Sequence, residues 1–532
     1  MSQYSLMATG GMMVAPHHLA AQAGRDVLRE GGHAIQAMVA AAATIAVVYP
    51  HMNALGGDGF WLIHEPGHPP RAIDASGVAG AGAHPAFYAG LDHIPSRGPQ
   101  AALTVAGTVS GWSRALELAQ GWSGPDLPLE RLLRDAIRHA RDGVAVTTSQ
   151  ADLTRDKLSG LQSQPGFAST FLDRGQAPQR GYLLRQPALA ETLRTLAQRG
   201  LDDFYRGQLG ASIGAALQRL GSPLSTADLA AYQAQVVPPL HLRLTGCAAN
   251  LYNLPPSSQG LASLIILGLY ERLQVLQAEG FAHVHGLVEA TKRAFRIRNQ
   301  LVTDPGRLPQ APESFLQPAM LDALAQDIDR QRALPWPEPS ATGDTIWMGA
   351  VDAAGRAVSF IQSVYWEFGS GVVLEETGLL WQNRGISFSL DPSHLNALEP
   401  GRHPFHTLNP ALALFDDGRV MPYGTMGGEG QPQTQAAVFS RYALHGQGLQ
   451  QAITAPRWVL GRTWGDPSTT LKLENRFDPA LIAALLAAGH AVEVLPASFS
   501  DTMGHAGAVV HHPSGLMEGA VDPRSDGAVC GV

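Results

Sequence analysis

The 532-residue sequence contains only two cysteines, Cys247 and Cys530, and neither lies in a CxxC or Cys/His spacing. A disulfide framework and a zinc site are therefore not indicated, and both residues are expected to be reduced thiols. The net charge is −8 and no block of basic residues occurs. This charge pattern disfavours binding to nucleic acid or to an anionic membrane.

Long apolar runs are also missing. The most membrane-like stretch, Ala34–Val48, is interrupted by Gln36 and is too short to span a bilayer, so we expect a buried helix there. Residues 1–6 lack the basic and apolar segments of a secretory signal. Since 45% of the residues are hydrophobic and 15% are charged, a soluble, cytoplasmic, core-rich globular protein is expected.

Helical periodicity runs through most of residues 127–324 and through two earlier stretches, where apolar residues recur every three to four positions. One helix is expected to start at Pro16 and to end at a C-cap made by Gly31-Gly32. Further helices are expected at Ala34–Val48, 129–140, 188–199, 209–220, 260–276 and 281–302.

The character of the chain changes near residue 344. Residues 305–343 are irregular and rich in proline, and the run 335–340 cannot continue a helix, so it reads as an exposed linker. Beyond it an apolar run, a turn at 352–356 and a second apolar run at 357–363 predict a β-hairpin. Further strands are expected at 60–64, Ala411–Phe415 and 508–510.

Thr345 stands where the linker meets this hairpin. A threonine hydroxyl is a poor nucleophile at neutral pH, because it is almost fully protonated. If the preceding peptide bond is cut, the freed α-amine can serve as a built-in base. An exposed first position of a central hairpin suits that chemistry, although a threonine that merely opens a strand is the more common case.

Short motifs spread over nearly the whole chain resemble the gamma-glutamyltransferase family of N-terminal-nucleophile hydrolases. Each motif is weak alone, but their order along the chain is specific. They are Gly31-Gly32, Pro50-His51, Gly56-Gly57-Asp58-Gly59-Phe60, Gly107 with Gly111, 203–207, 228–232, 255–260, Thr345, Phe368-Gly369-Ser370-Gly371, Asn383, Gly427-Gly428 and Asp522-Pro523-Arg524.

The resemblance implies a four-layer αββα sandwich made by an inactive precursor that cleaves itself between Asp344 and Thr345. Residues 1–344 would form a large subunit and residues 345–532 a small subunit, together making one fold. The sequence leaves open whether processed units pair as a homodimer.

The chemistry implied by the resemblance centres on Thr345. Its hydroxyl would attack an amide carbonyl, and backbone N–H groups at Gly427-Gly428 would hold the resulting oxyanion. A Gly-Gly pair alone more often marks a turn. Ser363 matches a hydroxyl that supports the threonine amine. This chemistry needs no metal or organic cofactor, and no cluster of ligand residues in the sequence suggests one.

The substrate positions depart from the family pattern. In the transferases an arginine after the strand at 72–74 binds the glutamyl α-carboxylate, yet 75–85 contains no arginine. Three further positions that contact the glutamyl group differ here: Ile386-Ser387, Tyr365 and His406-Thr407. The clamp for a glutamyl amino acid is therefore missing.

Arg384, directly after Asn383, is the expected replacement. A planar guanidinium can hold a carboxylate with two hydrogen bonds, although an arginine taken alone more often forms a structural ion pair. Trp366 and Phe405 would narrow the pocket, and His51 and Asn409 are further polar candidates. The expected substrate-binding residues are Arg384, Asn383, Tyr365, His406 and Thr407.

The segments 343–348, 366–369 and 381–385 resemble a subgroup that includes oxamate amidohydrolase. That implies hydrolysis of a small anionic amide such as oxamate to oxalate and ammonia, in purine and allantoin nitrogen metabolism. Three alternatives remain: a cephalosporin or glutaryl-type acylase, a gamma-glutamyl hydrolase or transferase, and a degenerate scaffold without activity. Whether transpeptidation occurs is also left open.

Overall fold

Two seven-stranded sheets lie face to face at the centre of the computed structural model, which describes residues 4–336, 344–461 and 469–532. The first sheet has the order β21 (Ala528–Gly531), β2 (Gly11–Ala15), β10 (Asp344–Asp352), β11 (Ala357–Tyr365), β3 (Asp58–His64), β4 (Arg71–Ala75) and β7 (Gln235–Val237). The second has the order β1 (Leu6–Ala8), β20 (Met517–Val521), β19 (Ala506–His511), β15 (Val420–Thr425), β14 (Ala411–Phe415), β9 (Ala249–Asn253) and β8 (Leu240–Leu244).

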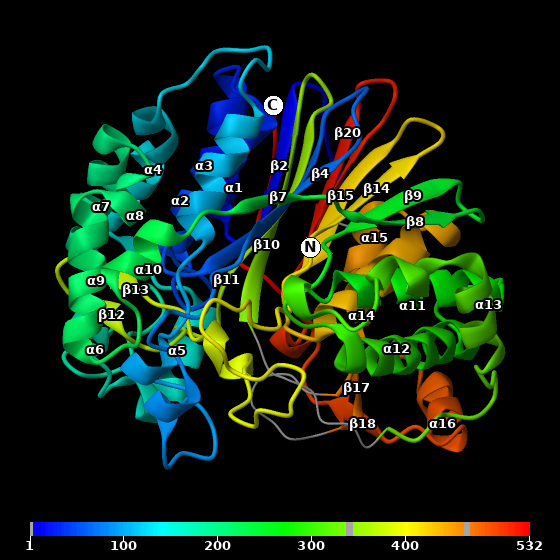
Figure 1. Cartoon of the computed structure of the whole chain (residues 1–532). Coiled ribbons are helices and arrows are strands. Elements are labelled where there is room, and N and C mark those ends of the chain that lie inside the picture. Colours follow the sequence, from blue (N-terminus) through cyan, green and yellow to red (C-terminus); the bar gives the residue numbers. More distant parts are fainter. Residues whose placement is uncertain (1–3, 337–343, 462–468) are drawn as a thin grey trace.

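Helices cover the outer face of each sheet (Figure 1). On the first sheet lie α1 (His18–Arg29), α2 (Ala34–Val48) and α3 (Thr108–Leu118), with α4 (Leu129–Asp142), α7 (Pro187–Arg199), α8 (Asp203–Arg206), α9 (Gln208–Leu220) and α10 (Thr226–Ala231) beyond them. On the second lie α11 (Gly260–Leu273) and α14 (Gly430–Phe439), with α12 (Phe281–Leu301), α13 (Pro318–Gln326) and α16 (Pro479–Ala487) beyond them. The expected four-layer αββα sandwich is confirmed.

Several smaller helices and sheets lie outside the four layers of the sandwich. They are α5 (Thr148–Leu161), α6 (Phe167–Phe171), α15 (Leu449–Thr454), the pairs β5 (Val144–Ala145) with β6 (Leu183–Leu184) and β12 (Val373–Leu374) with β13 (Leu379–Leu380), and the three-stranded sheet of β16 (Trp458–Leu460), β17 (Leu471–Glu474) and β18 (Val492–Leu495).

Helix α2 has the bounds that its sequence predicts. It starts at His33, whose side chain accepts from the Gln36 N–H while the Gln36 side chain accepts from the His33 N–H, and all fifteen of its residues are buried. Alanine keeps the helix thin enough to lie between the first sheet and α4. The preceding helix, α1, ends as expected, since Gly31 has a φ of +89°.

The β10–β11 hairpin is confirmed, and a tryptophan anchors it between the two sheets. Trp347 is 2% exposed, and its indole N–H donates to the Ser359 hydroxyl at 2.9 Å. Glycines on the facing sheet make room for the ring, because a Cβ at Gly424 or Gly507 would lie 2.2 or 2.5 Å from an indole carbon. The packing of Trp347 therefore fixes how β10, the strand that carries Thr345, lies against the second sheet.

Three strands lie in a region that the sequence analysis assigned mostly to helices. Strands β7, β8 and β9 occupy 235–253, and β8 alternates buried Leu240, Leu242 and Leu244 with exposed residues. That alternation is a two-residue period, which the longer helical pattern around it obscured. Helix α11 also ends at Leu273 instead of residue 276, because Gln274 adopts a φ of +50°. The core of the expected linker, 337–343, lies outside the described residues.

Candidate active site

Thr345 lies at a β-bulge in the central hairpin. Asp344 pairs with Tyr365 and Ile346 pairs with Gln362, so Thr345 alone faces the two residues between them on β11. Its side chain is buried, with 0% exposed. The expected exposed position is therefore wrong for the continuous chain, since the facing sheet and α14 cover the bulge. The Gln431 amide on α14 donates to the Thr345 hydroxyl at 3.5 Å.

Ser363 is one of the two residues that the bulge sets opposite Thr345. It is 1% exposed, and its hydroxyl accepts from the Tyr365 N–H at 2.7 Å. Tyr365 has a φ of +81°, a strained conformation for a residue with a side chain and one that clusters at functional sites. The bulge thus brings the two hydroxyl residues onto facing strands and turns the chain sharply after Ser363.

Gly427 and Gly428 link β15 to α14. Their φ values, +115° and +51°, lie in the region that glycine tolerates. Among the described residues, neither glycine N–H donates to a backbone carbonyl. The pair also precedes the N-terminus of α14, where the helix dipole favours negative charge. Free N–H groups beside a helix N-terminus can stabilise an oxyanion.

Arg384 is fully buried and stacks on Tyr365, with its guanidinium carbon 3.5 Å from the ring centroid. One terminal nitrogen donates to the Thr407 hydroxyl at 3.0 Å and the other to the Phe405 carbonyl at 3.4 Å, while Nε has no partner. Burial lowers the pKa of Arg384 to about 10, so it stays charged at neutral pH. Among the described residues no carboxylate bonds to it, and an anion would complete the site.

A single side-chain amide connects this arginine pocket to the glycine pair. Gln259 Nε2 donates to the carbonyl of Thr407 at 2.7 Å and to that of Gly428 at 2.9 Å. Its oxygen accepts from Arg298 at 3.0 Å, and Arg298 also pairs with Glu429 at 3.1 Å. Gln259 belongs to the 255–260 motif but is not among the site residues expected from the sequence, whereas in the structure it links the loop of Thr407 to the glycine pair.

The side chains of Asn383 and His406 bond to the protein itself. The Asn383 amide accepts from the Trp366 N–H at 3.1 Å and donates to the Ser96 carbonyl at 2.9 Å. His406 Nε2 lies 3.1 Å from Asp58 Oδ2, and its Nδ1 accepts from the Leu408 N–H at 3.4 Å. In this structure both residues hold the loops that carry Arg384 and Thr407.

Asp58 is a buried carboxyl that sequence reasoning did not assign to the site. Its Oδ1 accepts from Gln382, the Gly77 N–H and the Gly107 N–H at 2.9, 2.9 and 3.1 Å. Burial nevertheless raises its pKa to about 7. Burial also lowers the pKa of His406 well below its usual value, so the ring is neutral and donates a hydrogen bond to Asp58. The sequence did offer one sign of this role, because Asp58 is an acidic residue in a glycine-rich loop that leads into a buried strand.

Metal-ligating residues gather at one place in the described part of the chain. His285, Glu289 and His490 lie close together and are buried, a grouping that no spacing along the sequence indicated. Cys247 and Cys530 are free, as expected. No helix in the described ranges is both long and apolar enough to cross a bilayer.

Comparisons with known proteins agree with this geometry. The model of the gamma-glutamyltranspeptidase family matches residues 20–532. The oxamate amidohydrolase proenzyme of Klebsiella pneumoniae is 58% identical, and the match covers 99% of each chain. A glutathione hydrolase-like proenzyme of Bacillus subtilis, YwrD, is 40% identical over 99% of each chain. The crystal structure of cephalosporin acylase from Bacillus halodurans aligns with a TM-score of 0.90 and 32% identity, covering 100% of this chain and 97% of that one.

The match thus extends over the hairpin of Thr345, the glycine pair and the arginine pocket, and the named relatives are an amidohydrolase, a glutathione hydrolase-like protein and an acylase. The chain is an N-terminal-nucleophile hydrolase and belongs to the gamma-glutamyltranspeptidase family.

Proposed function

We propose that the chain is a precursor that cleaves itself before Thr345 and then hydrolyses oxamate to oxalate and ammonia. The observation that carries the choice of substrate is the buried, charged Arg384, which stacks on Tyr365 and bonds to no carboxylate of the described chain. The name of the Klebsiella pneumoniae relative supports the same substrate.

The proposed reaction begins after cleavage, when Thr345 carries a free α-amine. The amine takes the hydroxyl proton as Oγ1 attacks the amide carbon of the substrate. The carbonyl oxygen becomes an oxyanion held by the N–H groups of Gly427 and Gly428. Collapse breaks the C–N bond, the amine returns its proton to the leaving nitrogen, and ammonia departs. Water, deprotonated by the same amine, then hydrolyses the acyl ester on Thr345 and releases oxalate.

The remaining residues of the site have positioning roles in this proposal. Ser363, opposite Thr345 across the bulge, would support the amine. Arg384 would hold the oxamate carboxylate, Tyr365 would fix the guanidinium plane, and Thr407 would orient one of its nitrogens. A desolvated guanidinium binds a carboxylate far more strongly than an exposed one does, because water competes less for both partners.

The small anionic substrate is preferred over two larger ones that relatives suggest. A gamma-glutamyl group needs a clamp for its α-carboxylate and α-amine, and residues 75–85 supply no arginine for it. The structural likeness to a cephalosporin acylase keeps acyl amides as the second candidate. The deciding assay measures ammonia from oxamate beside turnover of a gamma-glutamyl anilide and a glutaryl amide. Turnover of only the larger amides would reject the oxamate assignment.

Processing is tested by mass spectrometry of the purified protein. The proposal expects two chains, 1–344 and 345–532, from the wild type and one chain from Thr345→Ala. An intact wild type would reject self-cleavage. We further propose a cytoplasmic enzyme of purine and allantoin nitrogen metabolism whose processed units pair as homodimers, which cell fractionation, growth on allantoin as nitrogen source and light scattering can test.

A further inference from the structure

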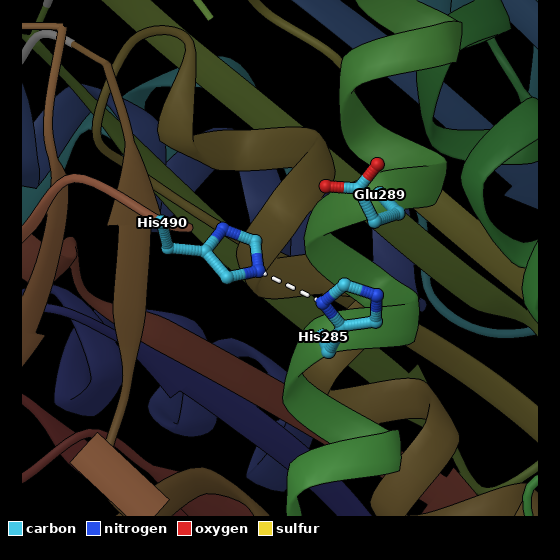
Figure 2. Close-up of side chains that lie close together, drawn as sticks. All are labelled: His285, Glu289 and His490. Atoms are coloured by element: carbon cyan, nitrogen blue, oxygen red, sulfur yellow. Dashed lines mark hydrogen bonds between the residues drawn. The ribbon is translucent and has the colours of Figure 1, made fainter. Parts of the chain in front are cut away.

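Three buried side chains of metal-ligating type meet on the outer side of the second sheet (Figure 2). His285 and Glu289 project from successive turns of α12, four residues apart and so on the same face of the helix. His490 comes from the segment between α16 and β18. One ligand atom from each residue lies within 4.8 Å of those of the other two.

The hydrogen bonds of His285 leave one nitrogen available to a cation. Its Nε2 lies 2.8 Å from the Asp329 carbonyl, which can only accept, so Nε2 carries the proton. In the neutral ring Nδ1 then carries a lone pair, and this atom lies 2.8 Å from His490 Nε2. A ring N–H that donates to a backbone carbonyl is the usual support of a metal-bound histidine. His285 is therefore oriented as a ligand.

Glu289 is 0% exposed, and its carboxylate is held from several sides. Lys292 Nζ lies 2.7 Å from one oxygen and Arg293 lies 2.6 Å from the other. Each cation also has a second acceptor at 2.6 Å, the Leu334 carbonyl for Lys292 and the Asp327 carbonyl for Arg293. One oxygen of Glu289 can thus turn to a metal while neither cation is left without a partner.

We propose that His285, His490 and Glu289 bind a divalent transition metal of the Zn²⁺ type. Two imidazoles and one carboxylate are a common zinc ligand set, with a fourth position left to water. Tetrahedral coordination needs the two facing nitrogens about 3.3 Å apart, so the rings would separate by roughly 0.5 Å from their present contact. His285 also lines a pocket of about 490 Å³ with Leu273, Val275 and Phe281, which gives the ion a route in.

The metal has no part in the amide chemistry. His285 lies roughly 20 Å along α12 from Arg298, the residue that contacts the candidate active site, at the rise of an α-helix. The site instead spans the two segments of the chain, since His285 and Glu289 precede Thr345 whereas His490 follows it. This second part rests on the proposed self-cleavage: in the processed protein the ion would tie the two subunits together.

Metal binding is tested on the full chain without a polyhistidine tag, stripped with a chelator and titrated calorimetrically with Zn²⁺. We expect one equivalent to bind, and Co²⁺ to give the absorption bands of a four-coordinate ion. His285→Gln and His490→Gln should each weaken binding at least about 100-fold. The control His241→Gln, on the exposed face of β8, should bind as the wild type does. Absence of saturable binding, or equal affinity in all variants, would overturn the site.

The bridging role is tested by urea-induced dissociation of the cleaved protein, followed by light scattering. Zn²⁺ should move dissociation to higher urea in the wild type and not in His490→Gln, whose fold is checked by retained amidase activity. Binding without such a shift would overturn the bridge. Uncleaved Thr345→Ala should still bind one Zn²⁺, so a failure of self-cleavage is told apart from a failure of the metal site.

Discussion

The guanidinium of Arg384 lies 3.5 Å from the ring centroid of Tyr365, and Tyr365 pairs across the hairpin with the residue before Thr345. Arg384 and Thr345, the proposed anion-binding group and nucleophile, are thereby both positioned by the bulge in β11. In the proposed reaction, this geometry fixes the position of the substrate carboxylate relative to the Thr345 hydroxyl.

Replacing Arg384 with lysine or alanine should raise the KM for oxamate by roughly 30-fold or more and leave self-cleavage intact. The substitution removes one partner of the buried pair that Arg384 would form with the substrate carboxylate, and such a loss costs about 2–5 kcal/mol. Self-cleavage should be unaffected, because it involves no substrate carboxylate. Steady-state kinetics and gel electrophoresis measure the two effects. Arg243→Ala, at an exposed ion pair with Asp416, is the matched control. Equal loss of cleavage and turnover would show a folding role instead.

Gln431→Met should slow both self-cleavage and turnover by roughly 3- to 10-fold. The substitution removes a side-chain donor to the Thr345 hydroxyl, and such a bond contributes about 0.5–1.5 kcal/mol. A time course of precursor disappearance, together with kcat, provides the measurement. Gln218→Met, exposed on α9, controls for loss of an amide elsewhere. Wild-type rates in Gln431→Met would mean that the contact is incidental.

Asp58 should make the folded state less stable as the pH rises from about 4 to 7. Its pKa is raised by burial to about 7 in the folded chain, from 3.8 ordinarily, so the folded state holds a proton that the unfolded state has released. The stabilising effect of that proton is complete below pH 4 and is lost as the pH passes 7. Thr345→Ala serves as background, because it keeps the chain in one piece.

The measurement is urea unfolding of this single chain with and without Asp58→Asn at several pH values. The stability difference, parent minus Asp58→Asn, should fall between pH 4 and 7 and level off above. A difference independent of pH, or one that grows with pH, would contradict the raised pKa.

Gly424→Ala should lower the melting temperature and slow self-cleavage. The added methyl would lie 2.2 Å from the Trp347 ring, which must move and carry the start of β10 with it. Overpacking of this kind typically costs about 1–3 kcal/mol. Gly448→Ala is the matched control, because nothing lies within 4 Å of its Cβ position and its φ is −59°. Calorimetry measures the melting temperature and a time course measures self-cleavage. If both are unchanged in Gly424→Ala, the indole of Trp347 can repack around the added methyl group.

Local sequence patterns predicted several elements of the fold. Helix α2 and the β10–β11 hairpin follow from apolar spacing and from turn residues within about twenty positions, so their bounds could be read from the chain. Strands β8 and β9 pair with each other as a short hairpin, and β9 also pairs with β14, which is more than 150 residues away. They were missed because their short alternation lies between long helices. The long-range pairing of β9 with β14 joins this hairpin to the second sheet, and no local pattern predicts that pairing.

By itself, the sequence determined the position of Thr345 at the start of a central hairpin and the absence of an arginine from 75–85, since each depends on residue order alone. The sandwich was implied by the resemblance of the motifs to the gamma-glutamyltransferase family. Only the tertiary structure decided that Thr345 is buried, that Asp58 bonds to His406, and that His285 meets His490. Those contacts join residues more than 200 positions apart, and desolvation in the packed core sets their charge states. No pattern along the chain predicts these long-range contacts or the charge states that burial produces.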